Sequence, residues 1–402
     1  MKILLPLLIG IIEVTTLFAY VDEYNNNYPI IASDYSIEKN EYKNKIKKIV
    51  TSWKPSSSPS CTCSNPEWCK PIDNGTPLRE KELFGFKDGT RMVNYNWTHI
   101  TSMAWGIGAD EICEAHSHGV KVIMPNPQVV LTSNITEREL WIENTVSQIV
   151  ERGLDGITFD YESPISASSN LGEYYTELIK GTTTALHKIS PSYQVSVCVA
   201  WSPDSIDGRS YPIKDLADAS DALYVMDYDT RSQVFDACLA SANAPYPGMI
   251  HGIQRYLDIG VQPDKLILGV PWYGYQYPCL PGTDKKARYC EIPEVPFRGI
   301  NCSDAAGGEL ALGSLLNLFN SKINITMSGY DTNMQAPWFN YFNGTSVIQY
   351  WYDSPAGLEL KYQYAKMMKL RGIGPFTFDY LWNLESEEDS KKYWSSYDAF
   401  FY

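Results

Sequence analysis

The sequence predicts an α/β protein, a (β/α)8 TIM barrel with a subdomain inserted after its seventh strand. From residue 61 onward, short β-prone segments alternate with helical patterns, and eight such segments can be distinguished. Alternating strands and helices imply parallel pairing through right-handed crossovers, and eight such units close into a barrel. The main alternative is a doubly wound open sheet, which usually has a Gly-rich phosphate-binding turn after its first strand. The sequence has no such turn.

The expected strands are short apolar segments rich in β-branched and aromatic residues. They cover residues 83–86, 100–105, 120–124, 155–162, 194–200, 222–228, 265–271 and 372–379. Three helical patterns are clearest. One covers 137–150 and follows Thr136, its expected cap; one covers 172–189 and is ended by Pro191; one covers 387–401 and closes the chain.

The connection after the seventh strand is too long for a simple loop. It covers about residues 276–350, and the next helix is expected to begin near Leu358. Long connections in compact domains are normally subdomains or functional lids. We therefore expect a lid-like insertion on the functional face of the barrel. It contains Cys279, Cys290, Cys302 and the aromatic run 338–342.

The first 60 residues differ in composition from the rest. Residues 1–19 have a basic start and a short apolar core interrupted by Glu13, which predicts a signal peptide, with an N-terminal core helix as the alternative. Residues 20–60 are polar and end in a Pro/Ser run, which predicts a disordered linker. The catalytic barrel is expected over 61–402. No other stretch has the ~18 apolar residues that a membrane helix needs.

Composition and charge narrow the classes of partner. With 44% hydrophobic residues the chain can bury a large core, and its 29 Tyr, 13 Phe and 11 Trp also offer stacking surface for sugar rings. The formal net charge of -14 argues against nucleic acid and against an anionic membrane surface, because little in the chain would neutralise phosphates. We expect a monomer that needs no cofactor.

Nine cysteines in a secretory chain predict disulfides. The spacing of Cys61, Cys63 and Cys69 resembles a metal cluster, but no His lies near it in the sequence, and we expect no metal site. The odd count leaves one thiol, and Cys198, inside an apolar strand, is expected to be buried and inert. Six Asn-X-Ser/Thr sequons are candidate glycosylation sites: Asn74, Asn96, Asn134, Asn301, Asn324 and Asn343.

Two carboxylates end the fourth expected strand. Because side chains alternate along a strand, Thr158, Asp160 and Glu162 should share one face. The C-terminal ends of barrel strands carry the active site. Asp160 and Glu162 are therefore a candidate acid/base pair, with the charged end of an edge strand as the alternative.

Aromatic and acidic residues stand at other strand ends. Strand two ends at Trp105, strand five leads into Trp201, strand six ends with Tyr228 and Asp229, and strand seven leads into Trp272. A single aromatic residue at such a place is more often part of the core or rim. Aromatic faces stack on pyranose rings, while carboxylates and a phenol bind hydroxyl and amide groups. Together these residues indicate a carbohydrate ligand.

Two of these stretches resemble a known family. Residues 155–162, DGITFDYE, resemble the D-G-x-D-x-D-x-E signature of the family 18 glycoside hydrolases, the chitinase family. Residues 226–229, MDYD, resemble that family's M-x-Y-D on strand six. More specifically, the chain resembles a branch of this family that hydrolyses chitobiose. The stretches that carry this resemblance are residues 61–69, 200–203, 241–246, 269–275, 295–307 and 370–374.

The resemblance implies retaining, substrate-assisted hydrolysis, an exception to the usual scheme with two protein carboxylates. Glu162 would protonate the glycosidic oxygen while the 2-acetamido carbonyl of the sugar attacks the anomeric carbon. Asp160 would bind the acetamido N–H, and Tyr228 would hold the acetamido oxygen. The further substrate contacts would be Asp229, Trp272, Trp201 and Trp105.

Two positions depart from the family pattern. Thr158 stands where the stricter signature has an Asp that would share a proton with the middle Asp. On strand eight, Phe376 stands where many members place a Trp under the sugar, and Trp382 follows a few residues later. A Phe can still stack, so Phe376 is a candidate floor of the site.

The resemblance implies cleavage of the GlcNAcβ1-4GlcNAc core of asparagine-linked oligosaccharides from the reducing end, in the lysosome, with secretion as the alternative location. The partner is a GlcNAc-containing oligosaccharide. Two other functions stay open: a chitinase acting on chitin or chitooligosaccharides, and a non-catalytic chitin-binding lectin. Inactive relatives typically lose the terminal Glu of the signature, whereas Glu162 is present.

Overall fold

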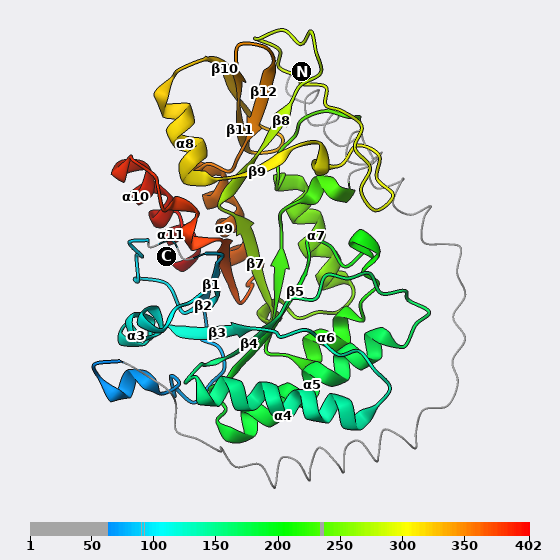
Figure 1. Ribbon diagram of the computed structural model, residues 1–402, viewed down its shortest axis with the longest axis vertical. Helices are drawn as coiled ribbons and strands as arrows, with labels where there is room; N and C mark the ends of the chain where they lie inside the picture. Colours follow the sequence, from blue (N-terminus) through cyan, green and yellow to red (C-terminus); the bar gives the residue numbers. More distant parts are fainter. Residues whose placement is uncertain (1–62, 90, 92, 234–236) are drawn as a thin grey trace, which may run out of the picture. The chain divides into compact units, whose positions relative to one another are not determined.

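The computed structural model describes residues 63–89, 91, 93–233 and 237–402. The predicted signal peptide, the segment 20–60 and Cys61 lie outside the described residues. The described chain forms a closed barrel of eight parallel strands with helices packed around it, and a separate five-stranded sheet (Figure 1). The prediction of a (β/α)8 barrel with an inserted subdomain is therefore confirmed.

All eight predicted strands are present and pair in parallel in the order β1-β13-β7-β6-β5-β4-β3-β2. They are β1 (Glu82–Lys87), β2 (Ser102–Trp105), β3 (Lys121–Pro125), β4 (Gly156–Phe159), β5 (Gln194–Ala200), β6 (Ala222–Met226), β7 (Leu266–Pro271) and β13 (Gly372–Phe376). Several strands end earlier than predicted. Asp160 and Glu162 therefore lie in the loop after β4, and not within the strand.

Helices follow most strands and cover the outside of the barrel (Figure 1). They are α3 (Ala109–Ser117), α4 (Ile135–Glu151), α5 (Leu171–Ile189), α6 (Ile213–Ala219), α7 (Tyr246–Asp258), α9 (Pro355–Met367), α10 (Glu387–Ser395) and α11 (Asp398–Phe401). Two details differ from prediction. Asn134 caps α4 by accepting hydrogen bonds from the next turn, so Thr136 is not the cap. The C-terminal segment forms two helices and not one.

The insertion after β7 is an antiparallel sheet with one helix. Its strand order is β10-β11-β12-β8-β9. The elements are β8 (Tyr273–Pro278), β9 (Gly308–Ala311), α8 (Leu312–Ser321), β10 (Ile325–Asp331), β11 (Ala336–Phe342) and β12 (Val347–Trp351). The predicted aromatic run lies on β11, where Trp338 and Phe339 are buried. The sheet begins directly after β7, so it grows from the C-terminal rim of the barrel.

The first Asp of the β4 signature is structural. Asp155 precedes β4 at the N-terminal end of the barrel and is fully buried. Its carboxylate accepts hydrogen bonds from the backbone N–H of Ile72 at 2.5 Å and of Val122 at 2.7 Å, and it contacts His116 Nε2 at 2.8 Å. Gly156 follows because a Cβ there would lie 1.9 Å from the Gln194 carbonyl oxygen. These two residues fix how β4 enters the barrel.

A buried charge network lies behind β6. Lys361 on α9 is fully buried and pairs with Asp353 at 2.8 Å, and it donates to the Ala244 carbonyl at 2.6 Å. Asp227 on the same side of the barrel is buried, and burial raises its pKa to about 7 against the favourable charge of Lys361. Burial likewise raises the pKa of Asp353. Lys361 is thus the cation that compensates two buried carboxyl groups.

Three disulfides are described: Cys63–Cys113, Cys238–Cys302 and Cys279–Cys290. Cys69 is also disulfide-bonded, so neither it nor Cys63 is a free thiol ligand. Cys198 is a free, buried cysteine, as predicted.

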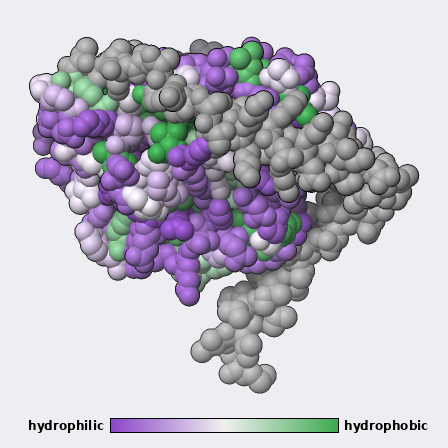
Figure 2. Space-filling view, turned by 90° about the horizontal axis from the view of Figure 1, so that it is seen from below, coloured by the Kyte–Doolittle hydropathy of each residue, from purple (hydrophilic) through white to green (hydrophobic). Residues whose placement is uncertain are grey.

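Hydrophilic residues cover most of the described surface on the face seen in Figure 2. Among the described helices, none combines the length and the apolarity that crossing a bilayer requires.

Candidate active site

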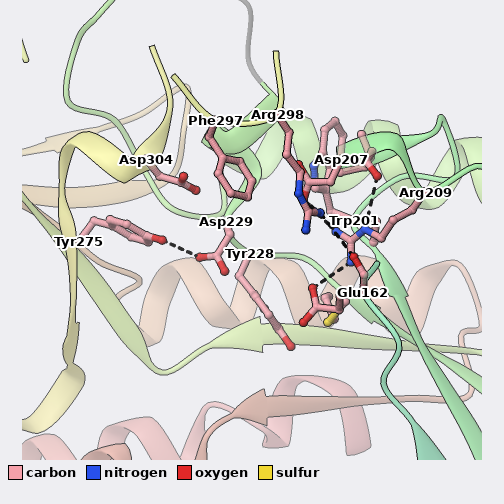
Figure 3. Close-up of a pocket in the computed structure, with 13 residues that line it drawn as sticks. Glu162, Trp201, Asp207, Arg209, Tyr228, Asp229, Tyr275, Phe297, Arg298 and Asp304 are labelled. Atoms are coloured by element: carbon pink, nitrogen blue, oxygen red, sulfur yellow. Dashed lines mark hydrogen bonds and ion pairs between the residues drawn. The ribbon is translucent and has the colours of Figure 1, made fainter. Parts of the chain in front are cut away.

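A cavity of about 320 Å³ lies at the C-terminal ends of the barrel strands. The loops after β4, β5 and β6 form one part of its wall, and the insertion forms the other (Figure 3). The lining residues are Glu162, Ala200, Trp201, Ile206, Asp207, Arg209, Met226, Tyr228, Asp229, Tyr275, Phe297, Arg298 and Asp304. Four residues proposed from the sequence, Glu162, Tyr228, Asp229 and Trp201, thus meet in one cavity.

Glu162 is paired with an arginine. Its side chain is about half exposed, and Oε2 lies 2.9 Å from Arg209 Nη1 (Figure 3). Arg209 itself is buried and is held by Asp207 at 3.1 Å. Because Arg209 cannot give up its proton, this ion pair places a permanent positive charge next to the Glu162 side chain. Glu162 therefore has a fixed cationic neighbour that the sequence pattern did not reveal.

Asp160 lies beside Glu162 in a more enclosed place. Burial, and next the charge of Glu162, raise the pKa of Asp160 to about 7, although Arg209 opposes the shift. Its backbone N–H donates to the Asn126 side-chain oxygen at 2.5 Å. Its Oδ1 atom is buried and has no hydrogen-bond partner among the described residues. A buried acceptor without a partner is costly, which suggests that a ligand donor completes it.

The position of the missing signature Asp is filled by two neutral groups. Thr158 is fully buried on β4, and its Oγ1 lies 3.7 Å from Cys198 Sγ on β5. Cys198 in turn interacts with the Asp160 carboxyl group, and burial raises the pKa of this thiol well above its usual range. Cys198 is therefore a neutral neighbour of Asp160, unsuited to act as a nucleophile.

Tyr228 and Asp229 follow β6 and face the cavity from the other side (Figure 3). Burial raises the pKa of Tyr228 well above its usual range, so its hydroxyl stays protonated and can donate a hydrogen bond. Asp229 has a left-handed backbone, with φ 53. It accepts hydrogen bonds from Tyr273 at 2.7 Å and Tyr275 at 3.1 Å, which fix its carboxylate.

The cavity is acidic, and its acids are easily protonated. Burial raises the pKa of Asp229 to about 6 against its two tyrosine donors. Burial, and next the charge of Asp229, raise the pKa of Asp304 to about 7. These carboxyl groups lose negative charge as the pH falls below neutrality, so mutual repulsion in the cavity is weakest at acid pH.

The predicted aromatic residues separate into two groups. Trp201 lines the cavity, and its indole Nε1 is buried without a hydrogen-bond partner among the described residues. Phe376 lies 5.4 Å from the Tyr228 ring and 5.4 Å from Trp105, measured between ring centroids. Phe376 thus lies between Tyr228 and Trp105, although neither Phe376 nor Trp105 is among the residues that line the cavity. Trp382 is 49% exposed and stacks on Arg91.

The prediction that Trp272 is a stacking wall is wrong. Trp272 is 0% exposed and packs between the barrel and the C-terminal helices, against Phe378, Trp394 and Tyr397. It stands between β7 and β8, where successive side chains point to opposite sides. Tyr273 and Tyr275 are the residues of this segment that reach the site, through Asp229.

Sequence reasoning also missed the cavity residues that lie outside the strand ends. Asp207 and Arg209 stand in a turn after β5, and Phe297, Arg298 and Asp304 belong to the insertion. The Asp207-Gly208 pair signals a turn, but not that the turn folds back onto Glu162. Among the described residues no group of three or more His, Cys, Asp or Glu side chains is arranged to hold a metal ion.

Comparison with known proteins agrees with this geometry. The model of the family "Glycosyl hydrolases family 18" matches residues 126–380. Di-N-acetylchitobiase of Rattus norvegicus is 38% identical over 85% of this chain and 93% of its own length. Probable di-N-acetylchitobiase 2 of Dictyostelium discoideum is 36% identical over 85% of this chain and 91% of its own length.

A solved structure matches at the level of the fold. The class V chitinase of Nicotiana tobaccum, crystallised as a complex with NAG4, superimposes with a TM-score of 0.60 at 17% identity, over 79% of this chain and 98% of that chain. The family itself is shown by the match of the family model over residues 126–380 and by the two relatives. The chain belongs to the family 18 glycoside hydrolases and is a glycosidase that hydrolyses O-glycosyl bonds.

Proposed function

We propose that this glycosidase cleaves the GlcNAcβ1-4GlcNAc bond of the chitobiose core of asparagine-linked oligosaccharides, from the reducing end. One observation carries the proposal: the buried Oδ1 of Asp160 has no hydrogen-bond partner among the described residues and lies in a carboxyl group next to Glu162. A 2-acetamido group offers the N–H that such an acceptor needs. The names and identities of the relatives reported above support the chitobiose specificity.

In the proposed mechanism the substrate supplies the nucleophile. Glu162 gives its proton to the glycosidic oxygen as the bond from that oxygen to the anomeric carbon breaks. The acetamido carbonyl oxygen closes on the same carbon and forms an oxazolinium ring. Tyr228 donates to that carbonyl oxygen and holds it in the attacking position. Glu162, now ionised, then takes a proton from water as the water opens the ring, and the anomeric configuration is retained.

Asp160 has two tasks in this scheme. It accepts the acetamido N–H, which orients the attacking group. It also supplies a carboxyl group whose charge changes near neutrality, because burial, and next the charge of Glu162, raise the pKa of Asp160 to about 7.

The pH dependence of hydrolysis should reveal the titration of Asp160. We expect kcat/KM for chitobiose to fall as the pH rises above about 7, where Asp160 loses its proton. Asp160→Asn should lower the rate and remove this limb, because asparagine does not titrate. The control is Asp304→Asn, since the pKa of Asp304 is also raised to about 7, but by burial and Asp229. A limb that persists near pH 7 in Asp160→Asn would contradict its assignment to Asp160.

Restoring the signature Asp should change the same profile. Thr158→Asp places a carboxyl group beside Cys198 and Asp160, in a fully buried position. We expect the pKa of Asp160 to rise further, because a second carboxyl group then lies close to it. The basic limb of kcat/KM should therefore shift to higher pH. Thr158→Asn is the matched control, because it has a similar size and no charge. An unchanged profile in Thr158→Asp would show that the position lies outside the proton network.

One substrate panel tests the function itself. Chitobiose, longer chitooligosaccharides and a free reducing-end N-glycan are incubated with the protein at acid and neutral pH. Release of GlcNAc from chitobiose and from the N-glycan supports the proposal. Release of internal fragments from long chains favours a chitinase, and binding without hydrolysis favours a lectin.

We also propose delivery to the lysosome, with secretion as the alternative. All six sequon asparagines are exposed, which permits glycosylation.

A further inference from the structure

The insertion contains a small hairpin that we call the finger, residues 295–302. Phe297 and Ile300 exchange two backbone hydrogen bonds, at 2.8 and 2.9 Å. The two residues between them, Arg298 and Gly299, have φ 42 and φ 91, which is the left-handed pair that a tight hairpin turn requires. Cys302 at the base is joined by a disulfide to Cys238, in the segment after β6. The finger is therefore a regular hairpin whose base is attached by a disulfide to the segment after β6.

The tip of the finger reaches the loops after β4 and β5. Arg298 Nη1 lies 3.7 Å from Asp207 and donates to the Glu162 carbonyl oxygen at 3.4 Å. Asp207 also holds Arg209, which pairs with the Glu162 carboxylate at 2.9 Å. Phe297 lies against Arg298 and lines the cavity beside it (Figure 3). The tip thus contacts the candidate acid residue through two routes, its backbone and Asp207.

These contacts lie on one particular side of the reacting bond. If Glu162 is the acid, the leaving oxygen must come within hydrogen-bond reach of its carboxylate. In the proposed mechanism Tyr228 and Asp160 hold the acetamido group of the sugar on the other side of that bond. The leaving sugar would then extend from Glu162 toward Arg209, Asp207 and the finger. An enzyme that cuts inside long chains needs an open groove in that direction.

We propose that Phe297 and Arg298 at the finger tip form a wall that leaves room for one sugar beyond Glu162, and that this wall determines which bond of a longer chain is cut. The inference rests on the proposed function and names the part of the chain that sets its specificity. The ion pair at 3.7 Å is weak on its own, because Arg298 is about one third exposed. The wall depends on the anchored hairpin backbone more than on that pair.

The test is the position of cleavage in chitotetraose in water enriched in oxygen-18, where each new reducing end carries the label. Mass spectrometry then separates leaving fragments, which are unlabelled, from the fragments that held the anomeric carbon. We expect the wild type to release unlabelled GlcNAc. Phe297→Ala with Arg298→Ala should raise the fraction of unlabelled GlcNAc2 about tenfold, a change of about 1.4 kcal/mol in relative barrier. Arg298→Ala alone should raise it less.

The control variant is Arg288→Ala. Arg288 belongs to the same insertion, pairs with Asp331 and is not among the residues that line the cavity. It should leave the cleavage position unchanged. Chitobiose is assayed in parallel, since it has one sugar beyond Glu162. No hydrolysis of chitobiose by the wild type would overturn the proposed function.

Other results would contradict the proposed role of the finger and leave the proposed function intact. These are chitobiose hydrolysis together with unlabelled GlcNAc2 as the main leaving fragment of the wild type, or an unchanged cleavage position in both finger variants. If the double variant does not fold, the wild-type pattern and Arg298→Ala, whose tip side chain is partly exposed, still decide the question.

Discussion

Glu162→Gln is expected to lower kcat/KM for chitobiose about 10²–10⁴-fold, the range that a positioned general acid contributes. Glutamine keeps the size of the side chain and can still accept a hydrogen bond from Arg209, which lies 2.9 Å from Glu162 in the wild type. Its amide group is not acidic, so it cannot protonate the leaving oxygen. Binding of chitobiose should therefore persist, and calorimetric titration of the variant measures it. Retained turnover would remove Glu162 from the acid role.

The leaving group separates this role from a structural one. An aryl leaving group needs less protonation than a sugar hydroxyl, so the loss in kcat/KM should be smaller for an aryl glycoside of GlcNAc than for chitobiose. An equal loss on both substrates would indicate that the substitution disturbs the site in general. Glu137→Gln is the matched control, because Glu137 lies exposed in the first turn of α4 and should leave both rates unchanged.

The second large effect concerns stability. Lys361→Met should lower the free energy of unfolding by about 3–5 kcal/mol at neutral pH, because it leaves Asp353 and Asp227 buried without their cation. The loss should be smaller near pH 4. Without Lys361 the folded protein keeps protons on these carboxyl groups at pH values where the unfolded chain has released them. Stability then falls as the pH rises above the ordinary Asp pKa of about 3.9.

Urea unfolding at acid and at neutral pH measures this loss. Lys361→Met combined with Asp353→Asn should recover part of it, since one uncompensated charge is then removed. Lys366→Met on the exposed side of the same helix is the control and should change stability by no more than about 0.5 kcal/mol. If Lys361→Met unfolds at the wild-type urea concentration at neutral pH, the network does not carry the stability assigned to it.

Periodic patterns made the barrel predictable. Eight apolar segments separated by helical patterns leave few alternatives, because chain connectivity and handedness then determine the closure. Strand ends were less predictable: the segment predicted as 155–162 is a strand only over Gly156–Phe159. A strand stops where its neighbours stop offering hydrogen bonds, and the local sequence does not record that. The extent of the insertion was predictable from its length, but its five-stranded sheet was not.

The site was predictable where residues follow strands and not elsewhere. Glu162, Tyr228, Asp229 and Trp201 meet because the C-terminal ends of parallel strands converge. Trp272 has the same kind of position in the sequence but lies in the core, since one step along an extended chain reverses the side. Arg209 reaches Glu162 across a turn, and no periodic pattern encodes such a contact. Contacts that turns make across the fold become visible only in the structure.

The β4 segment has one further consequence, which concerns how this chain could change during evolution. Asp155 binds backbone at one end of the barrel, while Glu162 faces the cavity at the other end, and only β4 separates them. Selection on stability would therefore act on Asp155, and selection on activity would act on Glu162. A descendant that lost Glu162 and kept Asp155 would still fold and could be recruited as a binding protein. A descendant that lost Asp155 would lose the contacts that fix how β4 enters the barrel, and with them part of the stability that any such new role requires.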